Sequence, residues 1–105
     1  MGNRIVDLLW NFGFSDECQV LIIEKRGDLM TIVGEVKDSA KTIQFYVDEL
    51  KALAAKHRYS YARSHLPRDG WINSLGTGQS PKDVLEASGF FVEPWMERAR
   101  SEHAA

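Results

Sequence analysis

The sequence predicts a small α+β domain in which a β-hairpin packs on a long amphipathic helix. Its 105 residues are the length of a single domain, which we expect to span 1–105 with frayed ends at 1–2 and 102–105. Two β-branched runs flank a short glycine-containing connection, which is typical of a hairpin. Apolar residues then recur at helical spacing over residues 40–57, which indicates the long helix.

The first element is predicted to be a short helix over residues 3–12. Four apolar side chains recur there at helical spacing and form one stripe: Ile5, Leu8, Leu9 and Phe12. Asn3 can cap the start of this helix, and Gly13 can adopt the left-handed conformation at its end. We therefore expect an N-terminal helix before the hairpin.

The hairpin is predicted from two strands, Gln19 to Lys25 and Leu29 to Lys37, joined at Arg26-Gly27-Asp28. The first strand is apolar on both faces, so we expect it to be central or covered on both sides. Gly34 interrupts the second strand and indicates a bulge or a close approach of the backbone.

The long helix is predicted from about Ala40 to His57, with Asp38 or Ser39 as its cap. Six residues share its apolar face: Ile43, Tyr46, Val47, Leu50, Leu53 and Ala54. Phe45 falls on the opposite face and needs a cover. We expect the C-terminal segment to pack there, and the alternative is a partner that contacts Phe45.

Residues 58–64 alternate in polarity and predict either a third strand that joins the hairpin or an extended loop. The following residues, to Gln79, are rich in glycine and predict a long loop, and such loops often carry function. Ser80 and Pro81 then start a short helix that ends at Gly89. Pro94 opens a second short helix, which completes the predicted order of elements.

A stretch without acidic residues stands out against the rest of the chain. From Leu50 to Arg68 there is neither Asp nor Glu, although the whole chain has 15 acidic residues and 13 Lys and Arg. The stretch holds five of these cations: Lys51, Lys56, Arg58, Arg63 and Arg68. Cations near the end of a helix are favourable for its dipole, which accounts for the first three. The last two lie well beyond the helix and point to a surface that meets anions.

The leading hypothesis is a small non-enzymatic regulator, inhibitor or accessory subunit that binds an acidic surface on a larger protein. Arginine forks recognise carboxylates, and Arg, Tyr and Trp are enriched at interface hot spots. The predicted contact surface, here called the basic–aromatic surface, consists of Arg58, Tyr59, Tyr61, Arg63, His65, Arg68 and Trp71.

Two alternatives use overlapping residues. RNA or DNA binding needs the same cations and stacking rings. The formal net charge of −2 and the pI near 5.9 weigh against a polyanionic partner, so this hypothesis comes second. A small-molecule enzyme that uses the 65–79 loop comes third, with His65 and Asp69 as acid–base groups. The sequence thus favours a non-enzyme.

Several classes of chemistry lack their motifs. Cys18 is the only cysteine, which excludes an internal disulfide and a cysteine-based zinc site. Gly76-Thr77-Gly78 lacks the further glycine and the Lys-Ser/Thr ending of a phosphate-binding loop. The three histidines, His57, His65 and His103, show no helical metal-ligand spacing. We therefore predict no metal and no cofactor.

The cellular setting follows from the same composition. No cationic segment followed by an apolar run opens the chain, and no apolar run approaches the roughly 20 residues that span a bilayer. We therefore expect a cytoplasmic protein with no membrane contact. The sequence leaves a homo-oligomer open.

Overall fold

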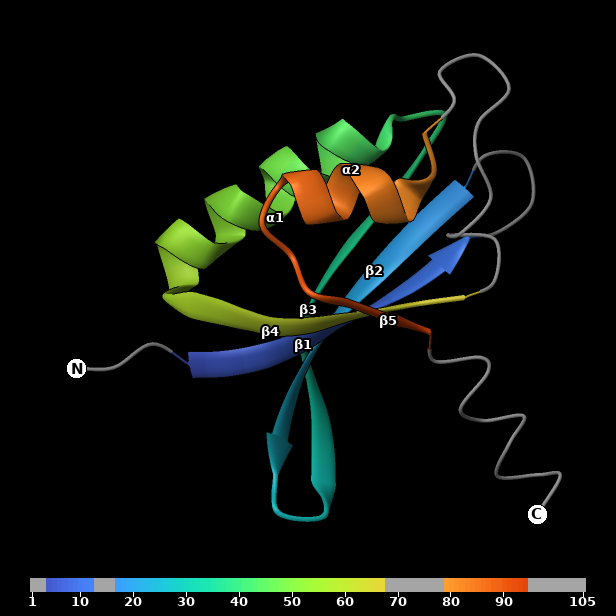
Figure 1. Ribbon diagram of the computed structural model, residues 1–105. Helices are drawn as coiled ribbons and strands as arrows, with labels where there is room; N and C mark the ends of the chain where they lie inside the picture. Colours follow the sequence, from blue (N-terminus) through green and yellow to red (C-terminus); the bar gives the residue numbers. More distant parts are fainter. Residues whose placement is uncertain (1–3, 13–16, 68–78, 95–105) are drawn as a thin grey trace, which may run out of the picture.

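The computed structural model describes residues 4–12, 17–67 and 79–94, which form a five-stranded sheet and two helices (Figure 1). The elements are, in chain order, β1 (Arg4–Phe12), β2 (Glu17–Arg26), β3 (Leu29–Ser39), α1 (Ile43–His57), β4 (Tyr59–Leu66), α2 (Pro81–Ala87) and β5 (Val92–Pro94). The order of strands across the sheet is β3-β2-β1-β4-β5, so β1 is the central strand.

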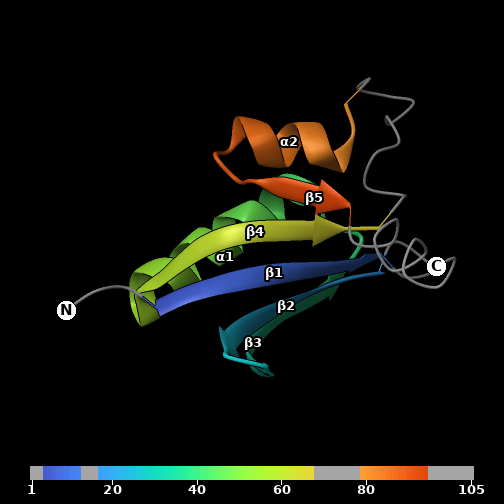
Figure 2. The same ribbon diagram turned by 60° about the horizontal axis from the view of Figure 1, so that its bottom comes forward.

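The sheet is mixed. The first three strands form an antiparallel meander, whereas β4 runs parallel to β1 and β5 runs parallel to β4. Each parallel connection contains a helix, α1 before β4 and α2 before β5, as a parallel pair requires. Figure 2 shows the five strands side by side in this order.

The predicted N-terminal helix is wrong, because residues 4–12 form the central strand β1. Val6, Leu8 and Trp10 are buried, and the residues between them are less so, which is the alternation of a strand. The apolar positions of this segment fit a helical stripe as well as a strand. Pairing with β2 on one side and β4 on the other decided between them.

The predicted α+β fold class is therefore wrong as well. A mixed five-stranded sheet dominates the domain in place of an N-terminal helix and a hairpin packed on a long amphipathic helix. The helix α1 has 15 residues and begins at Ile43, because Thr42 rather than Asp38 or Ser39 caps it. The Thr42 hydroxyl accepts a hydrogen bond from the Phe45 amide at 3.2 Å.

Other local predictions are confirmed. The hairpin pairs β2 with β3, and the register shifts at Ile22/Ile23, opposite Gly34. A Cβ atom on Gly34 would lie 3.1 Å from Ile22 Cδ1, so the close approach expected there is also present. Residues 59–66 form a strand rather than a loop, but contrary to the prediction this strand pairs with β1 and β5 and does not join the hairpin. Ser80 starts α2 with a capping box. The last predicted helix and the frayed ends lie outside the described residues, apart from Pro94, which ends β5.

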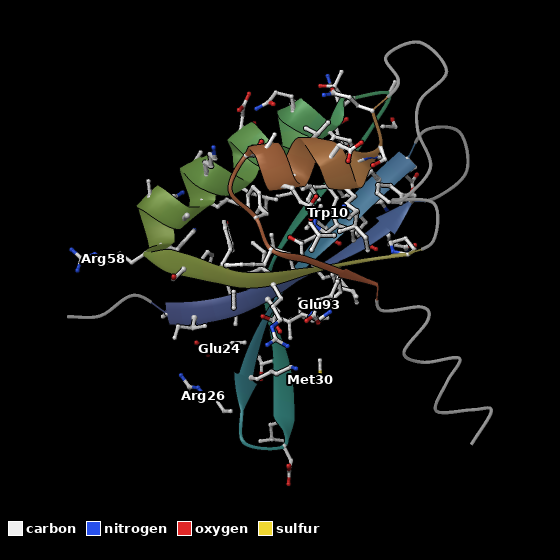
Figure 3. All side chains as sticks on the ribbon, in the orientation of Figure 1. Trp10, Glu24, Arg26, Met30, Arg58 and Glu93 are labelled. Atoms are coloured by element: carbon white, nitrogen blue, oxygen red, sulfur yellow. The ribbon has the colours of Figure 1, made fainter. Side chains whose placement is uncertain are left out.

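Both helices cover one face of the sheet, here called the covered face (Figures 1 and 2). The core lies between this face and the helices. It contains Val6, Leu8, Trp10, Cys18, Val20, Ile22, Tyr46, Val47, Leu50, Tyr59, Leu66 and Leu85. Figure 3 shows Trp10 between the helices and the sheet. Burial of these side chains is the main source of stability.

The opposite side of the sheet is here called the open face, because no helix within residues 4–12, 17–67 and 79–94 packs on it. The strand register places six apolar side chains of the antiparallel strands there: Ile5, Leu9, Leu21, Ile23, Met30 and Ile32. Ile5, Met30 and Ile32 are at least 60% exposed. Within the described part of the chain, no helix is long and apolar enough to cross a membrane.

Candidate active site on the open face of the sheet

Asp7 lies in the middle of β1, and its carboxylate is on the open face, with 15% of the side chain exposed. The Arg63 amide donates a hydrogen bond to Asp7 Oδ1 at 3.2 Å. The other oxygen, Oδ2, lies 3.3 Å from His65 Nε2 and 3.8 Å from Lys25 Nζ. The carboxylate is therefore fixed through one oxygen by the backbone, while its other oxygen meets side-chain donors.

A bulge in β4 produces this arrangement. Val6 pairs with Tyr61 and Leu8 pairs with Ser64, so two residues of β4 stand opposite Asp7 alone. A bulge of this kind leaves one residue outside the ladder and redirects its backbone groups. Here the Arg63 amide donates to the Asp7 side chain.

The site continues across β4 to β5. His65 stands between Leu9 of β1 and Glu93 of β5 in the register. Its Nδ1 atom lies 3.9 Å from Glu93 Oε2, and Arg63 Nη1 lies 3.3 Å from Glu93 Oε1. Figure 3 shows Glu93 on the side of the sheet away from the helices. The Asp7 cluster is defined as Asp7, Lys25, Arg63, His65 and Glu93.

The cluster does not enclose a metal ion by itself. Among the described residues, no three His, Cys, Asp or Glu side chains are arranged to hold one. Magnesium needs less, because it keeps several waters and binds proteins through one or two carboxylates together with substrate phosphates. Ligating carboxylates are usually oriented by a further hydrogen bond, which the Arg63 amide supplies to Asp7. A hydrated divalent cation at Asp7 Oδ2 would therefore have this one protein ligand among the described residues, and water and a substrate phosphate would have to supply the rest.

The basic–aromatic surface is divided between different environments. Arg58 caps the end of α1 in a left-handed conformation, with φ of 60°, and points away from the body (Figure 3). Tyr59 is 6% exposed and belongs to the core. The Tyr61 hydroxyl donates to the Leu50 carbonyl, and burial raises the pKa of Tyr61 to about 12. Both tyrosines thus belong to the covered face, where Arg4 and Val6 are their partners in β1.

The remaining members of the basic–aromatic surface lie partly within and partly outside the described residues. Arg63 and His65 join the Asp7 cluster, whereas Arg68 and Trp71 lie outside the described residues. Phe45 is half-buried against the core, edge-on to Tyr46 and beneath the Lys41 ammonium. Whether a partner binds at any of these positions stays a prediction.

Sequence reasoning missed Asp7, Lys25 and Glu93. One signal pointed to Asp7, which is the single charged residue in the apolar run from Ile5 to Trp10. A charged side chain within a run that builds a core is informative, since burial of an unpaired charge is costly.

Comparison with known proteins finds that this chain resembles solved structures in its fold alone. No protein-family model matches the chain, and no curated protein matches it. The chain resembles the large terminase from a thermophilic bacteriophage, with a TM-score of 0.60 and 14% identity over 90% of this chain and 24% of the terminase. The same terminase in complex with ADP gives a TM-score of 0.57 and 13% identity, over 90% of this chain and 23% of the terminase. The chain thus spans about a quarter of the terminase.

Proposed function

We propose that this chain hydrolyses phosphodiester bonds in nucleic acid with the help of a divalent cation at Asp7. The observation that carries the proposal is the oriented, partly buried carboxylate on the open face of the central strand. The likeness to a phage large terminase supports the choice of an enzyme class by analogy of fold alone.

The cation would be held by Asp7 Oδ2, with water and a substrate phosphate completing its coordination. A bound divalent cation polarises a phosphoryl oxygen and lowers the pKa of bound water. The Arg63 amide keeps the carboxylate in one orientation throughout, because it bonds the other oxygen. Orientation of this kind contributes to catalysis because less reorganisation remains for the reaction step.

His65 is the group in the cluster suited to proton transfer. Its Nε2 atom faces Asp7 and its Nδ1 atom faces Glu93, so the ring is held between two carboxylates. The side chain is 17% exposed, which leaves an edge open to substrate. A cation at Asp7 Oδ2 would release Nε2 from that oxygen. The neutral ring could then accept a proton from an attacking water at Nε2 and, once protonated, return one to the leaving oxygen. The Arg63 guanidinium, 56% exposed, can contact a neighbouring phosphate.

A polymer fits this site better than a small metabolite. Small-molecule sites are concave and bury most of their ligand. The Asp7 cluster instead lies on a sheet face that no described helix covers, beside exposed Ile5 and Met30. The net charge of −2 opposes binding to a polyanion, so we expect weak binding that depends on the cation.

Two other assignments are less well supported. The terminase binds ADP, but this chain spans 23% of it, and its sequence lacks a phosphate-binding glycine loop. The protein-binding regulator expected from the sequence stays a prediction. The inward placement of Tyr59 and Tyr61 removes two of the hot-spot side chains on which that hypothesis depended.

The test is cleavage of single- and double-stranded DNA and RNA by the 105-residue chain with Mg²⁺ or Mn²⁺. We expect cleavage that EDTA abolishes and that Asp7→Asn reduces by at least about 100-fold, because the amide is a poor cation ligand. Glu35→Gln is the matched control, since Glu35 is on the same face at the edge strand β3.

The proposal fails if the folded wild-type chain cleaves none of these substrates. It also fails if Asp7→Asn cleaves at the wild-type rate. Thermal melts of each variant separate a loss of activity from a loss of structure.

A further inference from the structure

We propose that Lys25 is the built-in counter-ion of Asp7, which a divalent cation must displace in order to bind. Lys25 would then set the concentration at which the site takes up its cation. The inference rests on the proposed cation site at Asp7 and adds the residue that regulates it.

The strand register brings the two side chains together. Asp7 stands opposite Ile23 of β2, and Lys25 is two residues further along the same face. Long side chains reach across such a diagonal. The Lys25 ammonium lies 3.8 Å from Asp7 Oδ2, the same oxygen that is left for a cation.

The pair combines a sheltered anion with an exposed cation. The Asp7 side chain is 15% exposed and the Lys25 side chain is 57% exposed. A sheltered carboxylate gains from a counter-ion, because its own hydration is reduced. The ammonium remains in water, and such exposed pairs are weak. Lys25 can therefore leave Asp7 at small cost when a stronger cation arrives.

The other donors at Asp7 cannot take this role. Arg63 contacts Asp7 through its backbone amide, and its guanidinium pairs with Glu93. His65 shares its ring between Asp7 and Glu93, and it is a cation only when protonated. Lys25 is thus the one described side chain that brings a full positive charge to Asp7 alone.

Removal of the lysine charge should strengthen cation binding for two reasons. No ion pair has to be broken, and no ammonium repels the incoming ion. For charges a few ångströms apart in a largely aqueous setting, these effects together amount to about a three- to tenfold change in affinity. Lys25→Met keeps most of the side-chain volume and removes only the charge.

The chain offers a close control. Lys37 is on the same face, where it pairs with Gln19 in the register. Its ammonium lies 3.8 Å from Glu17, and the side chain is 53% exposed, so the distance and the exposure of the lysine match those of Lys25, whereas Glu17 is itself 52% exposed. Lys37→Met therefore removes an equal charge from the same face without touching Asp7.

The experiment measures Mn²⁺ binding to the chain in the absence of nucleic acid, by electron paramagnetic resonance of the free ion. We expect Lys25→Met to bind Mn²⁺ about three- to tenfold more tightly than the wild type. Lys37→Met should match the wild type, and Asp7→Asn should lose the site. The inference is overturned if Lys25→Met binds equally or more weakly, or if the wild type binds no Mn²⁺ that depends on Asp7.

Cleavage assays on the same preparations separate this inference from the proposed function. Tighter Mn²⁺ binding by Lys25→Met without any cleavage contradicts the hydrolytic function and supports the counter-ion. Cleavage that depends on Asp7 but needs the same Mn²⁺ concentration in Lys25→Met and wild type contradicts the counter-ion and supports the function.

Discussion

The two faces of one sheet differ in what they present. On the covered face, the central strand contributes Val6, Leu8 and Trp10, each at most 1% exposed. On the open face, the same strand presents Asp7 and Leu9, and the neighbouring strands add exposed apolar and charged side chains. Residues adjacent in β1 thus alternate between the core and the open face.

The difference separates the source of stability from the proposed site. The covered face is an apolar core in which even a small change of volume is costly. The open face holds a carboxylate whose partners come from β2 and β4, and the two β4 residues also face Glu93 of β5. Side chains on that face can change charge without disturbing the core, so the fold and the site are largely separable.

Leu8 and Leu9 give the strongest test of the difference between the faces, because they are identical neighbours on opposite faces of β1. Leu8→Ala should cost about 2–5 kcal/mol in the free energy of unfolding, since it leaves a cavity in the core. Leu9→Ala should cost about 1 kcal/mol. Urea unfolding measures both. Equal losses for the two variants would show that the open face is packed as tightly as the core.

A smaller effect on stability comes from two buried groups that titrate at high pH. Burial raises the pKa of the Cys18 thiol to about 11 from its ordinary value of 9.0, and burial also raises the pKa of Tyr46 to about 12. Each raised pKa means that the folded state holds its proton more tightly than the unfolded chain does. Stability is therefore complete below pH 9 and falls as the pH rises towards about 11 and 12.

Thiolate absorbance at about 240 nm, followed against pH and corrected by the same titration of Cys18→Ser, measures the Cys18 titration, because tyrosinate absorbs in the same region. We expect a midpoint close to 11 in the native chain and a normal midpoint in urea. A native midpoint near 9.0 would mean that the covered face admits water at Cys18.

Elements with strong local signals could be predicted from the sequence. The Gly27 turn specified the hairpin, and the Ser80 capping box specified the start of α2. β1 could not be predicted, because its apolar spacing suits both periods and only its distant partners β2 and β4 select the strand. β5 has three residues, Val92–Pro94, which is too short to leave a periodic signal.

The candidate site was harder to predict from the sequence than the fold. Arg63 and His65 stand out in the sequence for their charge and not for their place beside Asp7. The other members of the cluster lie 18 to 86 positions from Asp7 in the sequence, from Lys25 to Glu93. Because the local pattern predicts a helix over residues 3–12, nothing local brings Asp7 next to β4. The topology of the sheet creates the site.

The central claim is that Asp7 Oδ2 is the point at which a divalent cation enters the open face. Anomalous diffraction from crystals soaked in Mn²⁺ tests it most directly. We expect a peak about 2 Å from Asp7 Oδ2, with the Lys25 ammonium moved away from its 3.8 Å position. Crystals with Lys25 still paired to Asp7 and no manganese at that oxygen would contradict the account.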